Sequence, residues 1–203
     1  MKSSRLLFFI SVFGLVLIAS FATTIFPVRA AGADSPIPAF ISFIDSIKNG
    51  QANVIRGVYS PDLFALKVVQ QPSNDASYVS PWKDLVTEFK AAHDAGNIGL
   101  LAHNDMAGQD FPALKTGQEV RVVFGDGKIE YYKVTKILRY QALQPKSMVS
   151  DFIDLDSGEQ LTWSKVFKIA YEGSHHLTFQ TCIYKDGEKA WGRLFVIATP
   201  SVP

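Results

Sequence analysis

The sequence predicts one mainly β domain, a barrel or a sandwich, behind an N-terminal export segment. A length of 203 residues and a hydrophobic content of 47% suit a single domain with an ordinary core. Many short apolar runs are separated by turn residues, which is typical of barrels and sandwiches. The clearest pair, residues 177–184 and 190–197, flanks a turn that contains Asp186-Gly187.

The N-terminus has the pattern of a targeting segment. Lys2 and Arg5 precede an apolar run over residues 6–26, and Ala31-Gly32-Ala33 fits the small-x-small rule for signal-peptidase cleavage. A run of about 20 apolar residues is also long enough to span a bilayer. Residues 1–33 are therefore a cleaved signal peptide or a retained membrane anchor. In either case we expect the domain at residues 34–203 to be extracytoplasmic, anchored at the cell surface or secreted.

Charge and cysteine content narrow the possible functions. The net charge is +1, and the first 33 residues hold three cations and no acid, which leaves −2 for the rest. No basic stripe suggests nucleic acid as a partner. The chain has one cysteine, Cys182, so no intramolecular disulfide can form. A lone thiol outside the cytoplasm is either a functional group or a small buried hydrophobe.

The first half of the domain predicts two helices around extended chain. Residues 39–48 have helical apolar spacing, and residues 58–70 form extended chain broken at Ser60-Pro61, before a polar loop at residues 72–77. Ser80 as N-cap and Pro81 in the first turn predict a helix over residues 80–95 that Gly96 ends.

The second half predicts strands. Residues 97–104 form a short strand with His103 at its end, and residues 118–124 and 129–137 form a hairpin around Gly125-Asp126-Gly127-Lys128. We further expect a strand at residues 152–155 and a helical turn at residues 163–167.

The last hairpin can be given a register. With Asp186-Gly187 as the two-residue loop, Cys182 faces Trp191 and Arg193 faces Gln180, so these four side chains share one face. Arg193 is then the diagonal neighbour of Cys182. The opposite face, assigned to the core, carries Leu177, Phe179, Thr181 and Ile183.

A cysteine beside an arginine suggests a nucleophile. A nearby cation favours the reactive thiolate, and a guanidinium can donate hydrogen bonds to a developing oxyanion. Such a site also needs a general acid and base, for which histidine is the usual side chain.

The chain offers four histidines for that role. His176 shares the face of Cys182 but lies roughly 20 Å away along the strand, and His175 points to the opposite face. His93 falls in the predicted helix, where surface exposure is the default. His103 ends a strand before a glycine-containing loop, a position that suits either a site residue or a solvent-facing histidine.

Three motifs in this region resemble those of the sortase family of cysteine transpeptidases. Thr178-Phe179-Gln180-Thr181-Cys182 is similar to the signature Thr-Leu-x-Thr-Cys, with Phe179 in place of leucine. Residues 101–104, Leu-Ala-His-Asn, resemble the family's histidine motif, and residues 191–196, Trp-Gly-Arg-Leu-Phe-Val, resemble its arginine strand. The match covers residues 97–200.

The resemblance implies a sortase-type closed eight-stranded β-barrel with a few short helices. It implies that Cys182 attacks a peptide carbonyl in a sorting motif to form a thioester, that His103 transfers protons, and that Arg193 holds the substrate and its oxyanion. The partners would be a peptide or protein with a sorting motif, an amine acceptor and, if the N-terminal segment is retained, a membrane. Thr181 would support the nucleophile or pack inward.

No metal or cofactor is expected, since Asp105, Asp110 and Asp126 lack calcium-loop spacing and the histidines form no zinc set. Two alternatives remain open. One is a non-catalytic sortase-fold binding or structural module, and the other is an exported thiol hydrolase that releases peptides to water.

Overall fold

The computed structural model describes residues 39–203. The predicted signal peptide or anchor at residues 1–33 lies outside these residues. Among the helices of residues 39–203, none is long and apolar enough to cross a membrane.

Eight strands close into a barrel, as predicted. Around the barrel the order is β1 (Ile55–Ser60), β2 (Phe64–Gln70), β3 (Leu85–Glu88), β4 (Ile98–Leu101), β9 (Leu177–Lys185), β10 (Glu188–Ser201), β6 (Ile129–Ala142) and β5 (Glu119–Phe124). β5 pairs with β1, and β10 pairs with both β9 and β6, so the strands form a complete circuit. The pairs β2–β3 and β4–β9 are parallel and the others are antiparallel.

The barrel interior is the main core. Alternate residues of each strand point inward, and the 3-10 helix η1 (Ala107–Ala113) adds Phe111 to them. The ring of Phe111 lies 5.0 Å from that of Phe179 and 6.0 Å from that of Phe64, centroid to centroid. All three side chains are buried. Phe179 and Leu177 therefore occupy the core face that the sequence predicts for them.

Helix α1 (Phe40–Ile47) covers the outside of β1 and confirms the predicted first helix. Its Phe43 and Ile47 side chains lie so close to Gly57 that a Cβ there would fall 2.7 Å from the Phe43 ring and closer still to Ile47. A glycine at this point of β1 is what lets the helix approach the sheet.

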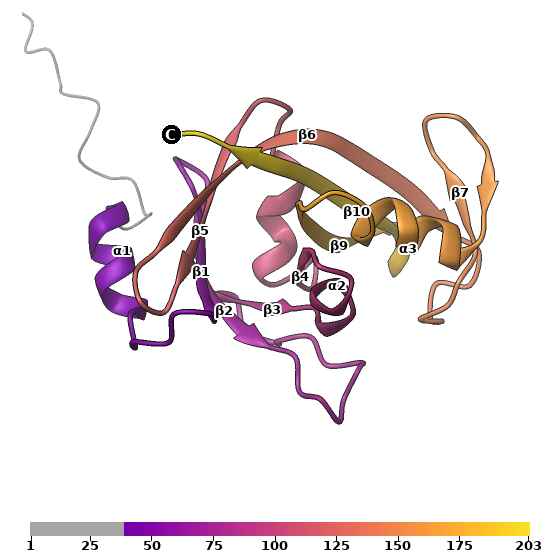
Figure 1. The fold of residues 1–203 in the computed structure, drawn as a ribbon. Helices are drawn as coiled ribbons and strands as arrows, with labels where there is room; N and C mark the ends of the chain where they lie inside the picture. The colour runs from indigo at the N-terminus through magenta and orange to yellow at the C-terminus, as the bar shows by residue number, and fades with distance from the viewer. Residues whose placement is uncertain (1–38) are drawn as a thin grey trace, which may run out of the picture. The chain divides into compact units, whose positions relative to one another are not determined.

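A second apolar layer covers the barrel on another side. Helix α3 (Trp163–Tyr171) and the short strands β7 (Phe152–Asp154) and β8 (Gln160–Leu161) lie at the end of the molecule away from α1 (Figure 1). Tyr171 of α3 packs edge-on against Phe195 of β10, and Phe195 packs against Tyr140 of β6. Helix α3 is longer than the predicted turn at residues 163–167, and β6 extends past the predicted residue 137.

The predicted helix over residues 80–95 is wrong. Residues 85–88 form strand β3 between β2 and β4, and only Lys90–Asp94 are helical, as α2. Strand β3 is nearly all buried, a setting that suits its β-branched and apolar residues. Ser80 caps no helix, because residues 81–84 form a turn into β3; its Oγ accepts from Trp82 N and its backbone N–H donates to Thr87 Oγ1. Gly96, at φ +83°, does end the helical turn as expected.

Candidate active site

Cys182 and Arg193 lie directly opposite each other on β9 and β10. Asp186 and Gly187 form the predicted two-residue turn, both with positive φ, and Lys185 faces Glu188. A bulge between Glu188 and Gly192 then shifts the register by two residues. The predicted pairs Cys182–Trp191 and Gln180–Arg193 are therefore wrong, but a shift of two keeps Cys182 and Arg193 on one face.

The Arg193 side chain is held by backbone carbonyls. Its Nη1 donates to Ala190 O at 2.8 Å and to Gly192 O at 2.9 Å, and its Nη2 donates to Pro145 O at 3.2 Å. Of its five N–H donors, two have no partner among residues 39–203. The guanidinium thus has a fixed place and spare donors beside the thiol.

His103 follows β4 in the loop that leads to η1. Backbone hydrogen bonds hold the loop on both sides of His103. Ala102 N donates to Gln180 O on β9, and His103 O accepts from the N–H groups of Met106 and Gly108. The imidazole is exposed and has no hydrogen bond to another residue of the part that the structure describes. Its nitrogens are therefore open to solvent.

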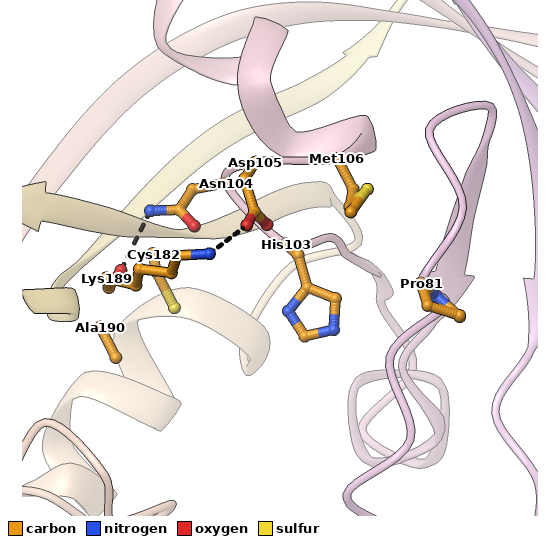
Figure 2. A pocket seen from close by; sticks show the side chains of 8 residues that line it. All are labelled: Pro81, His103, Asn104, Asp105, Met106, Cys182, Lys189 and Ala190. Carbon is orange, nitrogen blue, oxygen red and sulfur yellow. Dashed lines mark hydrogen bonds and ion pairs between the residues drawn. The ribbon is translucent and has the colours of Figure 1, made fainter.

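The three predicted site residues meet at a cavity on the outer face of the barrel. His103, Cys182 and Arg193 all line a cavity of about 370 Å³, which we call the Arg193 limb. Both His103 and Cys182 also line a second cavity of about 350 Å³, the Asp105 limb (Figure 2). Cys182 and His103 therefore border both cavities.

The Arg193 limb is walled by residues that the sequence did not single out as site residues. Part of one wall is the loop before β3, through Ala76, Ser77 and Val79, and another part is Met148 of the β6–β7 loop. Six aromatic side chains from α3, the strands beneath it and the residue before α2 form much of the remaining lining: Phe89, Phe152, Trp163, Phe167, Tyr171 and Phe195. In the sequence, part of this aromatic lining is indicated by the apolar positions of α3 and by the outward-facing positions of β10.

The Asp105 limb contains an ion pair. Lys189 Nζ bonds to Asp105 Oδ2 at 2.7 Å, and Asn104 Nδ2 donates to Lys189 O at 3.0 Å. Figure 2 shows these two bonds between the histidine loop and the β9–β10 hairpin. The hydrogen bond from Lys189 lowers the pKa of Asp105, and His103 lowers it further by a smaller amount.

Burial is the main influence on the pKa of the Cys182 thiol. It raises the pKa of the Cys182 thiol above the usual value, the Arg193 cation opposes this, and Asp105 and Glu188 add to the rise. In the resting site the thiol form therefore predominates at neutral pH. Removal of its proton becomes part of any nucleophilic step.

The three other histidines lie outside both limbs, whereas Thr181 borders the Arg193 limb. His176 is buried at the start of β9, where its ring bonds to Ala170 O and Ser174 O, and His175 bonds to Tyr132 Oη and Gly96 O. His93 is exposed on α2. Thr181 packs inward, and its Oγ1 has no hydrogen-bond partner among the described residues. In the same part of the chain, no three His, Cys, Asp or Glu side chains are arranged to hold a metal ion.

A closed eight-stranded β-barrel with a cysteine, an arginine and a histidine at one outer cavity is the arrangement expected of a sortase-type protein. No protein-family model and no curated protein matches the chain. Among solved structures, sortases match it at low sequence identity.

Three of these matches illustrate the level of similarity. Listeria monocytogenes sortase A is 12% identical with a TM-score of 0.47, over 73% of this chain and 88% of that one. Streptococcus suis sortase C1 is 14% identical with a TM-score of 0.46, over 80% and 78%. Clostridium perfringens sortase C, solved with its C-terminal cell wall sorting motif, is 16% identical with a TM-score of 0.45, over 80% and 83%. Similarity at this level assigns no activity to this chain.

Proposed function

We propose that this protein is an exported cysteine transpeptidase of the sortase type, with Cys182, His103 and Arg193 as its catalytic residues. The observation that carries the proposal is the meeting of the three side chains at one cavity, with Arg193 facing Cys182 and His103 on the neighbouring loop. The three motifs that these residues occupy, in the order His, Cys, Arg, support it as well.

The first half of the reaction takes place in the Arg193 limb. A peptide segment lies along the aromatic wall, with the scissile carbonyl between Cys182 and Arg193. The sulfur attacks this carbonyl as His103 accepts the thiol proton, and the free N–H donors of Arg193 bond to the oxyanion. His103 then gives its proton to the departing amine, which leaves an acyl thioester on Cys182.

The second half releases the acyl group to an amine. The acceptor reaches the thioester carbonyl from the limb that the acyl group does not fill. His103 accepts a proton from the incoming amine, the C–N bond forms, and the C–S bond breaks to return Cys182. Water attacking in place of the amine gives the hydrolase that the sequence left open.

The apolar segment at residues 6–26 supports export of this domain. The segment is then cleaved after Ala33 or retained as a membrane anchor, and the site faces peptide and amine partners outside the cytoplasm.

The test is product analysis with the full-length protein. The protein is incubated with a synthetic peptide pool randomised at its central positions, with and without glycinamide, and the products are read by mass spectrometry. We expect peptide–glycinamide adducts and a transient acyl group on Cys182. We expect Cys182→Ala to abolish both signals, and His103→Ala or Arg193→Gln to reduce the adduct about 10²-fold or more.

Matched control variants separate the loss of a catalytic group from a general loss of folded protein. His93→Ala and Arg139→Gln remove an exposed histidine and an exposed arginine that lie outside both limbs, and we expect them to keep the activity. Free acid without adduct would indicate the hydrolase. A thiol that forms no acyl group and reacts with iodoacetamide only on unfolding would indicate the non-catalytic binding module and refute the proposal.

A further inference from the structure

The two limbs that meet at Cys182 differ in charge. The Arg193 limb presents a guanidinium and an aromatic wall. The Asp105 limb holds one carboxylate and one ammonium, Asp105 and Lys189, as its only permanently charged lining side chains among residues 39–203. A cationic group approaching Cys182 is repelled by Arg193 in the first limb, whereas in the second the charges of Asp105 and Lys189 cancel.

The Lys189 ammonium already occupies the position that such a group would take. It bonds to Asp105 at 2.7 Å inside the cavity that His103 and Cys182 line. Figure 2 shows the Lys189 side chain extending toward Asp105 along the wall of this cavity. A primary ammonium group therefore lines the same cavity as Cys182 and His103.

The Lys189–Asp105 ion pair can be broken at little cost in folding stability. The side chains of Lys189 and Asp105 are 73% and 46% exposed, and ion pairs this exposed contribute little to stability. The loop does not depend on the Lys189 ammonium, because Asn104 bonds to the backbone oxygen of Lys189 and the loop's own backbone bonds hold His103.

We propose that Asp105 recognises the ammonium group of the amine acceptor, which displaces the Lys189 ammonium from the carboxylate. This inference rests on the transpeptidase function proposed above and assigns the acceptor to the Asp105 limb. The acceptor is thus a cationic primary amine. Lys189 keeps the carboxylate paired when no acceptor is present.

The bound ammonium gives one proton to the neutral His103 imidazole and becomes a free amine. The amine nitrogen attacks the thioester carbonyl, the C–N bond forms, and the C–S bond breaks. The second nitrogen proton ends on the Cys182 sulfur, and His103 returns its proton to solvent. The products are an amide and the free thiol.

The test compares two alkylating probes of different charge on the full-length protein. 2-Bromoethylamine carries an ammonium group two bonds from its reactive carbon, and iodoacetamide is neutral. Both form a C–S bond with loss of halide, and the chain has a single cysteine, so the label reports Cys182 alone. The ratio of the two rates, taken at a pH where the bromoethylamine nitrogen is protonated, cancels changes in the thiolate fraction.

We expect Asp105→Asn to lower the ratio of the bromoethylamine rate to the iodoacetamide rate by about 2- to 5-fold, and Lys189→Gln to raise it by a similar factor. The matched control Asp110→Asn, a nearby acid that does not line the limb, leaves the ratio unchanged. Iodoacetate, which is anionic, shows the opposite changes.

The outcomes separate this inference from the proposed function. A Cys182 that reacts with iodoacetamide in the folded protein, with the same ratio in all variants, overturns the ammonium site and leaves the transpeptidase standing. A thiol that reacts with neither probe until the protein unfolds overturns both.

Discussion

Replacing Gly108 by alanine tests how closely the loop that carries His103 packs against strand β9. A Cβ at this position would overlap Thr181 Oγ1 and lie 2.8 Å from His103 O and 3.0 Å from Ala102 O. Two of these atoms are backbone oxygens, so relief requires the loop itself to move. Overpacking of this kind costs about 1–3 kcal/mol, and at about 2–4 °C per kcal/mol we expect the melting temperature to fall by about 2–12 °C.

The assay is thermal unfolding alongside the rate of Cys182 alkylation by iodoacetamide well below the transition. We expect the rate to change in Gly108→Ala, because the displaced loop carries His103. The double variant Gly108→Ala/Thr181→Ala removes one of the clashing atoms and should recover part of the lost stability.

Gly50→Ala is the control for stability alone. Gly50 has φ +82° and no neighbour within 4 Å of a Cβ, so alanine there strains the backbone away from the site. It should lower the melting temperature and leave the alkylation rate unchanged. A Gly108→Ala variant that melts within about 1 °C of the wild type and alkylates at the same rate would refute the packing argument.

Three further perturbations test the site and the core. Arg193→Gln removes the cation that lowers the pKa of Cys182, so the inflection in the iodoacetamide rate against pH should move to higher pH; an unchanged inflection would contradict the electrostatics. Asn97→Ala removes the buried amide that donates to Tyr171 O and accepts from the backbone N–H of His176, and should cost about 2–4 kcal/mol in denaturant unfolding. Phe179→Ala should cost about 3–5 kcal/mol in the same assay, and a loss below about 1 kcal/mol would contradict its place in the core.

The strand content and the shared face of Cys182 and Arg193 could be predicted because both follow from local patterns. Side chains alternate along a strand whatever its partner, and the Asp186-Gly187 turn sets where the pairing starts. The bulge before Gly192 could not be predicted, since it depends on contacts from distant parts of the chain. Among them are the bonds that Asn104 and Asp105 make to Lys189.

Strand β3 was misread because a short buried strand followed by a helical turn has a helix-like apolar pattern. Leu85–Glu88 is a strand only because β2 and β4 flank it, which is information held by the tertiary fold. Likewise, the sequence marked His103 as a candidate but did not bring it to Cys182. Its position depends on the parallel pairing of β4 with β9, which joins segments almost 80 residues apart.

β10 is paired along both of its edges, so the strands that carry Cys182 and Arg193 tolerate less change than the loops that line the cavity. Arg193 faces Cys182 on one side and Tyr140 on the other, so neither reactive strand can shift without disturbing the barrel wall. The walls of the Arg193 limb come partly from the connections at residues 71–84 and 143–151, where changes of length and composition cost little. Under the proposed function, new peptide preferences are therefore best sought by exchanging these two connections while the strands that carry Cys182 and Arg193 are left intact.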